Sequence, residues 1–91
     1  MSGEIENPWV AYDMIGMVCV GRIVAEYINS VDIQLGDNQR HPITFIKTDI
    51  KGRFADPREA LNCACEHGRD RKELESFFRE SFGSVKLDPA E

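Results

Sequence analysis

Hydrophobic and polar residues alternate most clearly in the segment VDIQL, residues 31–35. Val31, Ile33 and Leu35 are apolar, and the two residues between them are polar. A period of two is typical of a strand with one buried face. The polar, glycine-containing loop at residues 36–41 follows at once and indicates a turn. The pattern therefore predicts a half-buried strand that ends at Leu35.

The segments on either side of this strand complete a predicted meander. PITFIKT, residues 42–48, has its proline at the first position, where a missing N–H donor does least harm to a strand. Between Met17 and Ile28 the apolar pairs have helical spacing, but β-branched and aromatic residues favour a strand. We predict a strand here, and thus a three-stranded antiparallel meander over Met17–Thr48 with turns at residues 29–30 and 36–41.

The N-terminal segment gives a different signal. Residues 1–7 have no apolar period and are predicted to form a flexible tail. Asn7 and Pro8 are typical of a helix cap and a first helical residue, so PWVAYDMI is predicted to form a short helix. Trp9 and Tyr12 would share one face of that helix.

Two helices are predicted in the C-terminal third. Asp56 as cap, Pro57 at the first position and Gly68 beyond the end predict a helix over Pro57–His67. Asp70 and Glu73 have capping-box spacing and begin a second helix, Arg71–Phe82. Apolar residues at helical spacing give this helix one buried stripe, and a glycine follows it.

These elements predict one α+β domain over residues 8–84, with a short C-terminal tail at 85–91. A chain of 91 residues is too short to close a second core. The two helices are expected to cover one face of the small sheet. The predicted core consists of Val20, Ile23, Val31, Ile33, Leu35, Ile43, Phe45, Leu61, Ala64, Cys65, Leu74, Phe77, Phe78 and Phe82.

Charge and composition narrow the function classes. The net charge of −5 disfavours general attraction to a polyanion, and no apolar run approaches the length of a membrane span. The acidic N-terminus is unlike a secretory signal, and three cysteines are an odd number for a disulfide scaffold. We therefore expect a cytoplasmic protein with reduced thiols.

The segment CACEHGRDRK, residues 63–72, concentrates the most reactive side chains. Cys63 and Cys65 lie about 200° apart on a helix, so they cannot bind one ion together. We expect Cys65 to face the sheet and Cys63 to be more exposed. Cys63 and His67 have the spacing of paired helical ligands, and Cys19 and His41 are the remaining soft donors for a zinc site. A zinc-binding structural domain is thus one alternative; the preferred interpretation has no metal and no cofactor.

A second alternative is a small-barrel nucleic-acid-binding protein. The region from Arg40 to Arg58, which includes KTDIKGRF at residues 47–54, gathers cations without equal acid. A small β-meander with a basic loop is typical of several nucleic-acid-binding barrels. Few aromatic residues are present to stack on bases, so this alternative is less favoured.

The sequence contains no complete catalytic constellation, and we predict a protein that is not an enzyme. Cys63 lacks an identifiable base and orienting group, and the carboxylates near Asp56 are explained by helix capping. We predict a protein-binding module, an accessory or inhibitor protein of the kind that phages and mobile elements often encode, which occupies a partner's surface. A homodimer is a variant of this interpretation. The predicted partner-binding residues are Trp9, Tyr12, Arg40, Lys51 and Arg53.

Overall fold

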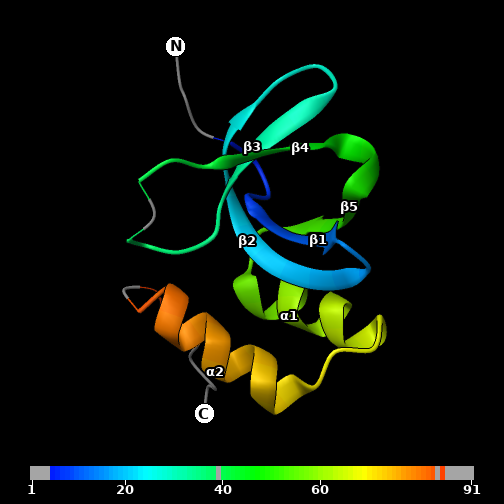
Figure 1. Cartoon of the computed structure of the whole chain (residues 1–91), viewed down its shortest axis with the longest axis vertical. Coiled ribbons are helices and arrows are strands. Elements are labelled where there is room, and N and C mark those ends of the chain that lie inside the picture. Colours follow the sequence, from blue (N-terminus) through cyan, green and yellow to red (C-terminus); the bar gives the residue numbers. More distant parts are fainter. Residues whose placement is uncertain (1–4, 39, 84, 86–91) are drawn as a thin grey trace.

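A computed structural model of the chain describes residues 5–38, 40–83 and 85. It is an α+β fold in which a five-stranded antiparallel sheet is covered on one face by two helices (Figure 1). The strand order is β4-β3-β2-β1-β5. The elements are β1 (Trp9–Met14), β2 (Met17–Glu26), β3 (Ser30–Gln34), β4 (Ile43–Ile46), the 3-10 helix η1 (Lys47–Asp49), β5 (Ile50–Phe54), α1 (Pro57–Glu66) and α2 (Arg71–Ser81).

The predicted α+β class and the meander are confirmed, because β2, β3 and β4 pair in sequence as antiparallel strands. The sheet has five strands and not three. The predicted N-terminal helix is wrong: residues 9–14 form β1 and pair with β2 on one side and β5 on the other. Residues 9–12 are all buried, so this strand has apolar residues on both faces and no alternation in its sequence.

The segment predicted as a basic loop is also partly a strand. Residues 47–49 form η1, and residues 50–54 form β5 against β1. Ile50, Gly52 and Phe54 alternate with Lys51 and Arg53. The two cations obscured a period-two pattern that is typical of a strand.

Both predicted helices are present. The Asp56 carboxylate accepts a hydrogen bond from the Arg58 amide at 2.9 Å, as expected of a cap. Gly68 follows α1 with φ at +100°. Asp70 stands before α2 without a side-chain hydrogen bond to the described first turn, so the predicted capping box does not form. Of the described helices none is long and apolar enough to cross a membrane, and the longer one has 11 residues.

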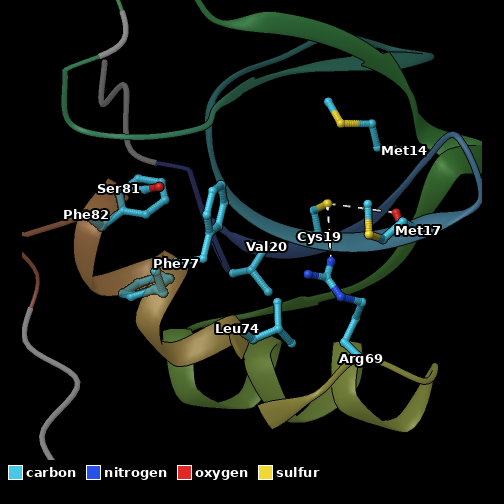
Figure 2. Close-up of a pocket in the computed structure, with 10 residues that line it drawn as sticks. Met14, Met17, Cys19, Val20, Arg69, Leu74, Phe77, Ser81 and Phe82 are labelled. Atoms are coloured by element: carbon cyan, nitrogen blue, oxygen red, sulfur yellow. Dashed lines mark hydrogen bonds between the residues drawn. The ribbon is translucent and has the colours of Figure 1, made fainter. Parts of the chain in front are cut away.

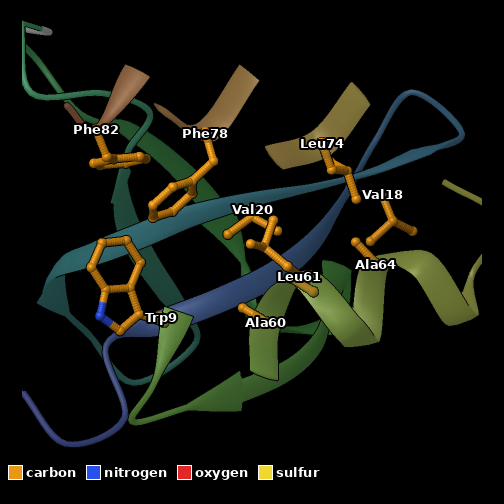
Figure 3. Packing of buried hydrophobic residues seen from close by; sticks show 10 residues of the cluster. Trp9, Val18, Val20, Ala60, Leu61, Ala64, Leu74, Phe78 and Phe82 are labelled. Atoms are coloured by element: carbon orange, nitrogen blue, oxygen red, sulfur yellow. The ribbon is translucent and has the colours of Figure 1, made fainter. Parts of the chain in front are cut away.

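The core consists of two clusters separated by the sheet. The helix-side cluster fills the space between the sheet and the helices (Figure 3) and contains Trp9, Ala11, Val18, Val20, Ala60, Leu61, Ala64, Leu74, Phe78 and Phe82. The inner cluster lies on the opposite, concave face and contains Val10, Tyr12, Ile23, Val31 and Ile33. Gly21 belongs to this inner face, where a Cβ atom would lie 2.5 Å from Cγ2 of Ile33.

Most of the predicted core is buried. Leu35, Phe45 and Cys65 are only half-buried. Ile43 and Phe77 are 40% and 55% exposed, because Ile43 begins the edge strand β4 and Phe77 lies on the rim of a groove beside α2. The prediction did not include Trp9, Val10, Ala11, Tyr12, Val18 and Ala60.

The predicted tails at residues 1–7 and 85–91 lie mainly outside the described residues. Ile5 and Val85 are described, and they pack against the inner cluster and the helix-side cluster respectively.

Candidate functional site

An apolar groove lies between the β1–β2 hairpin and α2 (Figure 2). Its volume is about 260 Å³. The lining is almost entirely aliphatic, aromatic or sulfur-containing, with one charged side chain. The lining residues are Met14, Met17, Cys19, Val20, Arg69, Leu74, Phe77, Phe78, Ser81 and Phe82.

The hairpin turn beside the groove exposes an unusual residue. Ile15 has φ at +53° and is 99% exposed. A β-branched residue is strained in this left-handed region, which two-residue hairpins normally fill with asparagine, aspartate or glycine. The following Gly16 has φ at +81°, and its amide donates to Oδ1 of Asp13 at 3.1 Å. The turn therefore holds an exposed apolar side chain at a conformational cost.

The groove follows a part of β2 that pairs on one side only. Residues 17–22 pair with β1, and β3 begins to pair at Arg22, which lies opposite Gln34. We call residues 17–21 the open half of β2, because no other described strand flanks it. Cys19 lines the groove from one face of the strand and Val20 from the other, so the groove wraps around this free edge.

Arg69 closes part of the free edge. Its Nη1 donates to the carbonyl oxygen of Val18 at 2.8 Å and lies 3.7 Å from Sγ of Cys19. The end of α1 aims the side chain: the Arg69 amide donates to the Ala64 carbonyl, and the Gly68 amide donates to that of Cys65. These are the two hydrogen bonds of a Schellman motif. The helix terminus therefore fixes where the guanidinium enters the groove.

The other half of β2, residues 22–26, has a covered edge. We call it the covered half. The Ile23 amide donates to the Pro8 carbonyl at 2.8 Å, so the chain before β1 lies along the edge. Arg53 fixes this segment by donating to the carbonyls of Glu6 and Asn7 and by pairing with Glu26 at 2.9 Å. Hydrogen bonds from Arg53 and then from Lys47 lower the pKa of the Glu26 carboxyl to about 2.

Trp9 and Tyr12, two of the predicted partner-binding residues, belong to the core. Trp9 is 7% exposed and packs between Phe78 and Phe82, with ring centroids 5.5 and 5.3 Å away. Tyr12 is 2% exposed in the inner cluster, and burial raises its pKa. Both residues lie on β1 between β2 and β5, and both side chains are buried.

Ion pairs neutralise much of the positive charge in the predicted basic region. Arg53 and Lys47 share Glu26, at 2.9 and 3.0 Å, and Arg58 pairs with Asp56 at 2.8 Å. Arg40 and Lys51 are exposed, and neither has an ion pair with any described residue. The region therefore presents little concentrated positive charge to a phosphate backbone.

The possible zinc ligands do not converge. The described Cys, His, Asp and Glu residues include no group of three that could hold a metal ion. Cys19 lies in the groove beside Arg69, whereas Cys63 packs near Gly52 of β5. His41 and His67 are both exposed. The structure thus separates the set Cys63, His67, Cys19 and His41.

Cys63 borders a second hollow of about 240 Å³ with Phe54, Glu59, Asn62 and Glu66. Burial, and next the Glu66 carboxylate, raise the pKa of the Cys63 thiol. A nucleophilic cysteine needs the opposite shift. Cys63 and Cys65 are both half-buried, so the predicted difference in their exposure is not seen.

Sequence reasoning missed the groove. Arg69 lies inside the segment CACEHGRDRK, for which only the thiols and the histidine were considered as functional groups. The pair Ile15-Gly16 is the sequence signal for the hairpin turn beside the groove. Isoleucine is a poor residue for a tight turn, so its presence there is unusual. Comparisons with protein-family models, with curated proteins and with solved structures give no match for this chain.

Proposed function

We propose that the protein is a non-catalytic binding module that holds a segment of another protein in the groove between the open half of β2 and α2. The observation that carries this proposal is the exposed apolar rim. Met17 and Phe77, which line the apolar groove, are 49% and 55% exposed, and Ile15 in the adjoining hairpin turn is 99% exposed. Apolar surface gathered around a concave site is typical of a site for a macromolecular partner.

The chemistry of the lining supports binding over catalysis. Among the described residues that line the groove, only Cys19 and Arg69 have ionisable side chains. In the part of the chain that the structure describes, no carboxylate or imidazole lines the groove to serve as a general base. A protein that works by occupying a partner's surface, as an accessory factor or inhibitor does, needs only a rigid framework and an apolar contact area. The capped α1 and the two-cluster core provide that framework.

Selection from a random displayed peptide library tests the proposal. Wild-type protein should retain peptides that a Phe77→Ser variant does not retain, because Phe77 is on the rim and contributes little to the core. A Lys51→Ser variant, altered at an exposed residue of β5 away from the groove lining, should retain the same peptides as wild type. If wild type and Phe77→Ser retain the same peptides, the groove is not the binding site.

A further inference from the structure

We infer that the occupant of the groove is an extended segment of a partner protein that adds to the open half of β2 as a new strand and places a carboxylate against Arg69. This inference rests on the proposed function and specifies the conformation and chemistry of the segment that binds.

The direction of the backbone groups supports strand addition. The hydrogen bond from Arg69 shows that the Val18 carbonyl points away from β1 and into the groove. Arg22 pairs with β3 on that same side. Backbone groups of alternate residues in a strand point to one side, so the N–H and C=O of Val20 also point into the groove. An unpaired strand edge of this kind is the recognition element in β-strand addition.

The groove also provides places for side chains on both faces of an added strand. Cys19 and Met14 pack against the inner cluster, whereas Leu74 and Phe78 of α2 belong to the helix-side cluster. Figure 2 shows Cys19, Met14 and Leu74 around the groove. An extended segment directs successive side chains to opposite faces. Alternate apolar residues of the partner would therefore enter these two regions. The free edge from Met17 to Val20 accommodates about four residues, or about 13 Å of extended chain.

Arg69 determines the charge of the partner. Lys47, Arg53, Arg58 and Arg71 all pair with carboxylates, whereas Arg69 has no ion pair with any described residue. Within the described part of the chain, only Nη1 of Arg69 donates a hydrogen bond, which leaves donors of the guanidinium for a ligand. A half-buried guanidinium in an apolar groove is best satisfied by a carboxylate, which forms short charge-assisted hydrogen bonds with it.

The test uses a peptide selected on the wild-type protein. Selected peptides should share an acidic residue among alternating apolar residues. Arg69→Gln should weaken binding about 10- to 100-fold, as expected for the loss of a charge-assisted hydrogen bond. Replacing the acidic residue of the peptide with its amide should cause the same loss on wild-type protein. This second arm remains informative if Arg69→Gln fails to fold.

Amide hydrogen exchange tests the strand geometry. Bound peptide should slow exchange at Val18 and Val20, whose amides face the groove. Cys19, opposite Tyr12 in the ladder with β1, is the internal control and should change little.

If peptides bind without an acidic preference, or without protecting Val18 and Val20, the inference is wrong while the proposed function stands. If no peptide distinguishes wild type from Phe77→Ser, the proposed function itself fails. A dimer of the chain that protects the same amides would replace the partner segment with a second copy.

Discussion

The two halves of β2 are both extended strand, but their unpaired edges have different surroundings. Each half lacks a neighbouring strand on one side. In the covered half, the chain at residues 6–8 lies along that side. Its carbonyls accept one hydrogen bond from the Ile23 amide and two from Arg53, which also pairs with Glu26. In the open half, Arg69 satisfies the Val18 carbonyl, and the rest of the edge borders an apolar groove.

The difference shows how the fold treats exposed strand edges. Free edges invite pairing with other chains, and proteins usually cover them. Here one edge is covered by the chain itself and fixed by charges, whereas the other is left beside exposed apolar residues. The same fold covers one edge and leaves the other open, which supports our proposal that the open half is kept free to bind a partner.

The largest expected effect separates the packed side of α2 from its exposed rim beside the groove. Phe78→Ala removes a ring that is 2% exposed and packed at a tilt against Trp9, and it should cost about 3–5 kcal/mol of unfolding free energy. Phe77→Ala, at the adjacent and 55% exposed residue, should cost under about 1 kcal/mol. Chemical denaturation of both variants measures the two values. Equal losses would mean that Phe77 on the rim is packed as tightly as Phe78.

A second variant tests the covering of the other edge. Arg53→Met removes the ion pair with Glu26 and the hydrogen bonds to the carbonyls of Glu6 and Asn7. We expect a loss of about 1–2 kcal/mol and faster amide exchange at Ile23, with no change at Val20. Denaturation and hydrogen exchange measure these effects. Unchanged exchange at Ile23 would show that Arg53 does not hold the covering segment.

The same ion pairs predict a pH dependence. The folded state lowers the pKa of Glu26 from 4.5 to about 2. A lowered pKa means stability that is present above the unfolded value and is lost as the pH falls from about 5 toward 2. Since the side chain is 37% exposed, solvent screening should keep the effect at or below about 1 kcal/mol.

The matched comparison for this pH effect is Glu26→Gln. The difference in unfolding free energy between wild type and Glu26→Gln should shrink toward zero as the pH approaches 2. A difference that is constant over this range would show that Glu26 acts through packing and not through charge.

The smallest expected effect is a gain in stability at the hairpin turn. Ile15→Asn places a residue that tolerates a positive φ at a position with φ of +53°, and it should stabilise the protein by about 0.5 kcal/mol. The same change removes an apolar group from the turn beside the groove and should weaken binding of a selected peptide. Thermal denaturation and peptide titration measure the two effects. If Ile15→Asn stabilises the protein but binds the peptide as tightly as wild type, Ile15 is not part of the binding site.

Much of the fold could be predicted from local patterns. β3 has one buried face and alternates accordingly, and α1 has a cap at Asp56 and a glycine after its end. β1 could not be predicted in this way. Its residues 9–12 are buried on both faces, and the Asn7-Pro8 signal before it is typical of a helix start.

The candidate site was less accessible to sequence reasoning. An unpaired strand edge is defined by where β3 ends, and this depends on the tertiary structure and not on residues 17–21. Arg53 looked like part of a basic surface, yet Glu26, 27 positions away, neutralises it. A local charge pattern does not predict an ion pair between residues that are so far apart in the sequence.

The burial of β1 on both faces also affects how the molecule unfolds. Val10 and Tyr12 belong to the inner cluster, and Trp9 and Ala11 belong to the helix-side cluster. If the packing of either cluster is disrupted, β1 is disturbed, and β1 also contributes residues to the other cluster. The helices and the curved sheet should therefore form one cooperative unit, with no stable intermediate that keeps only the sheet.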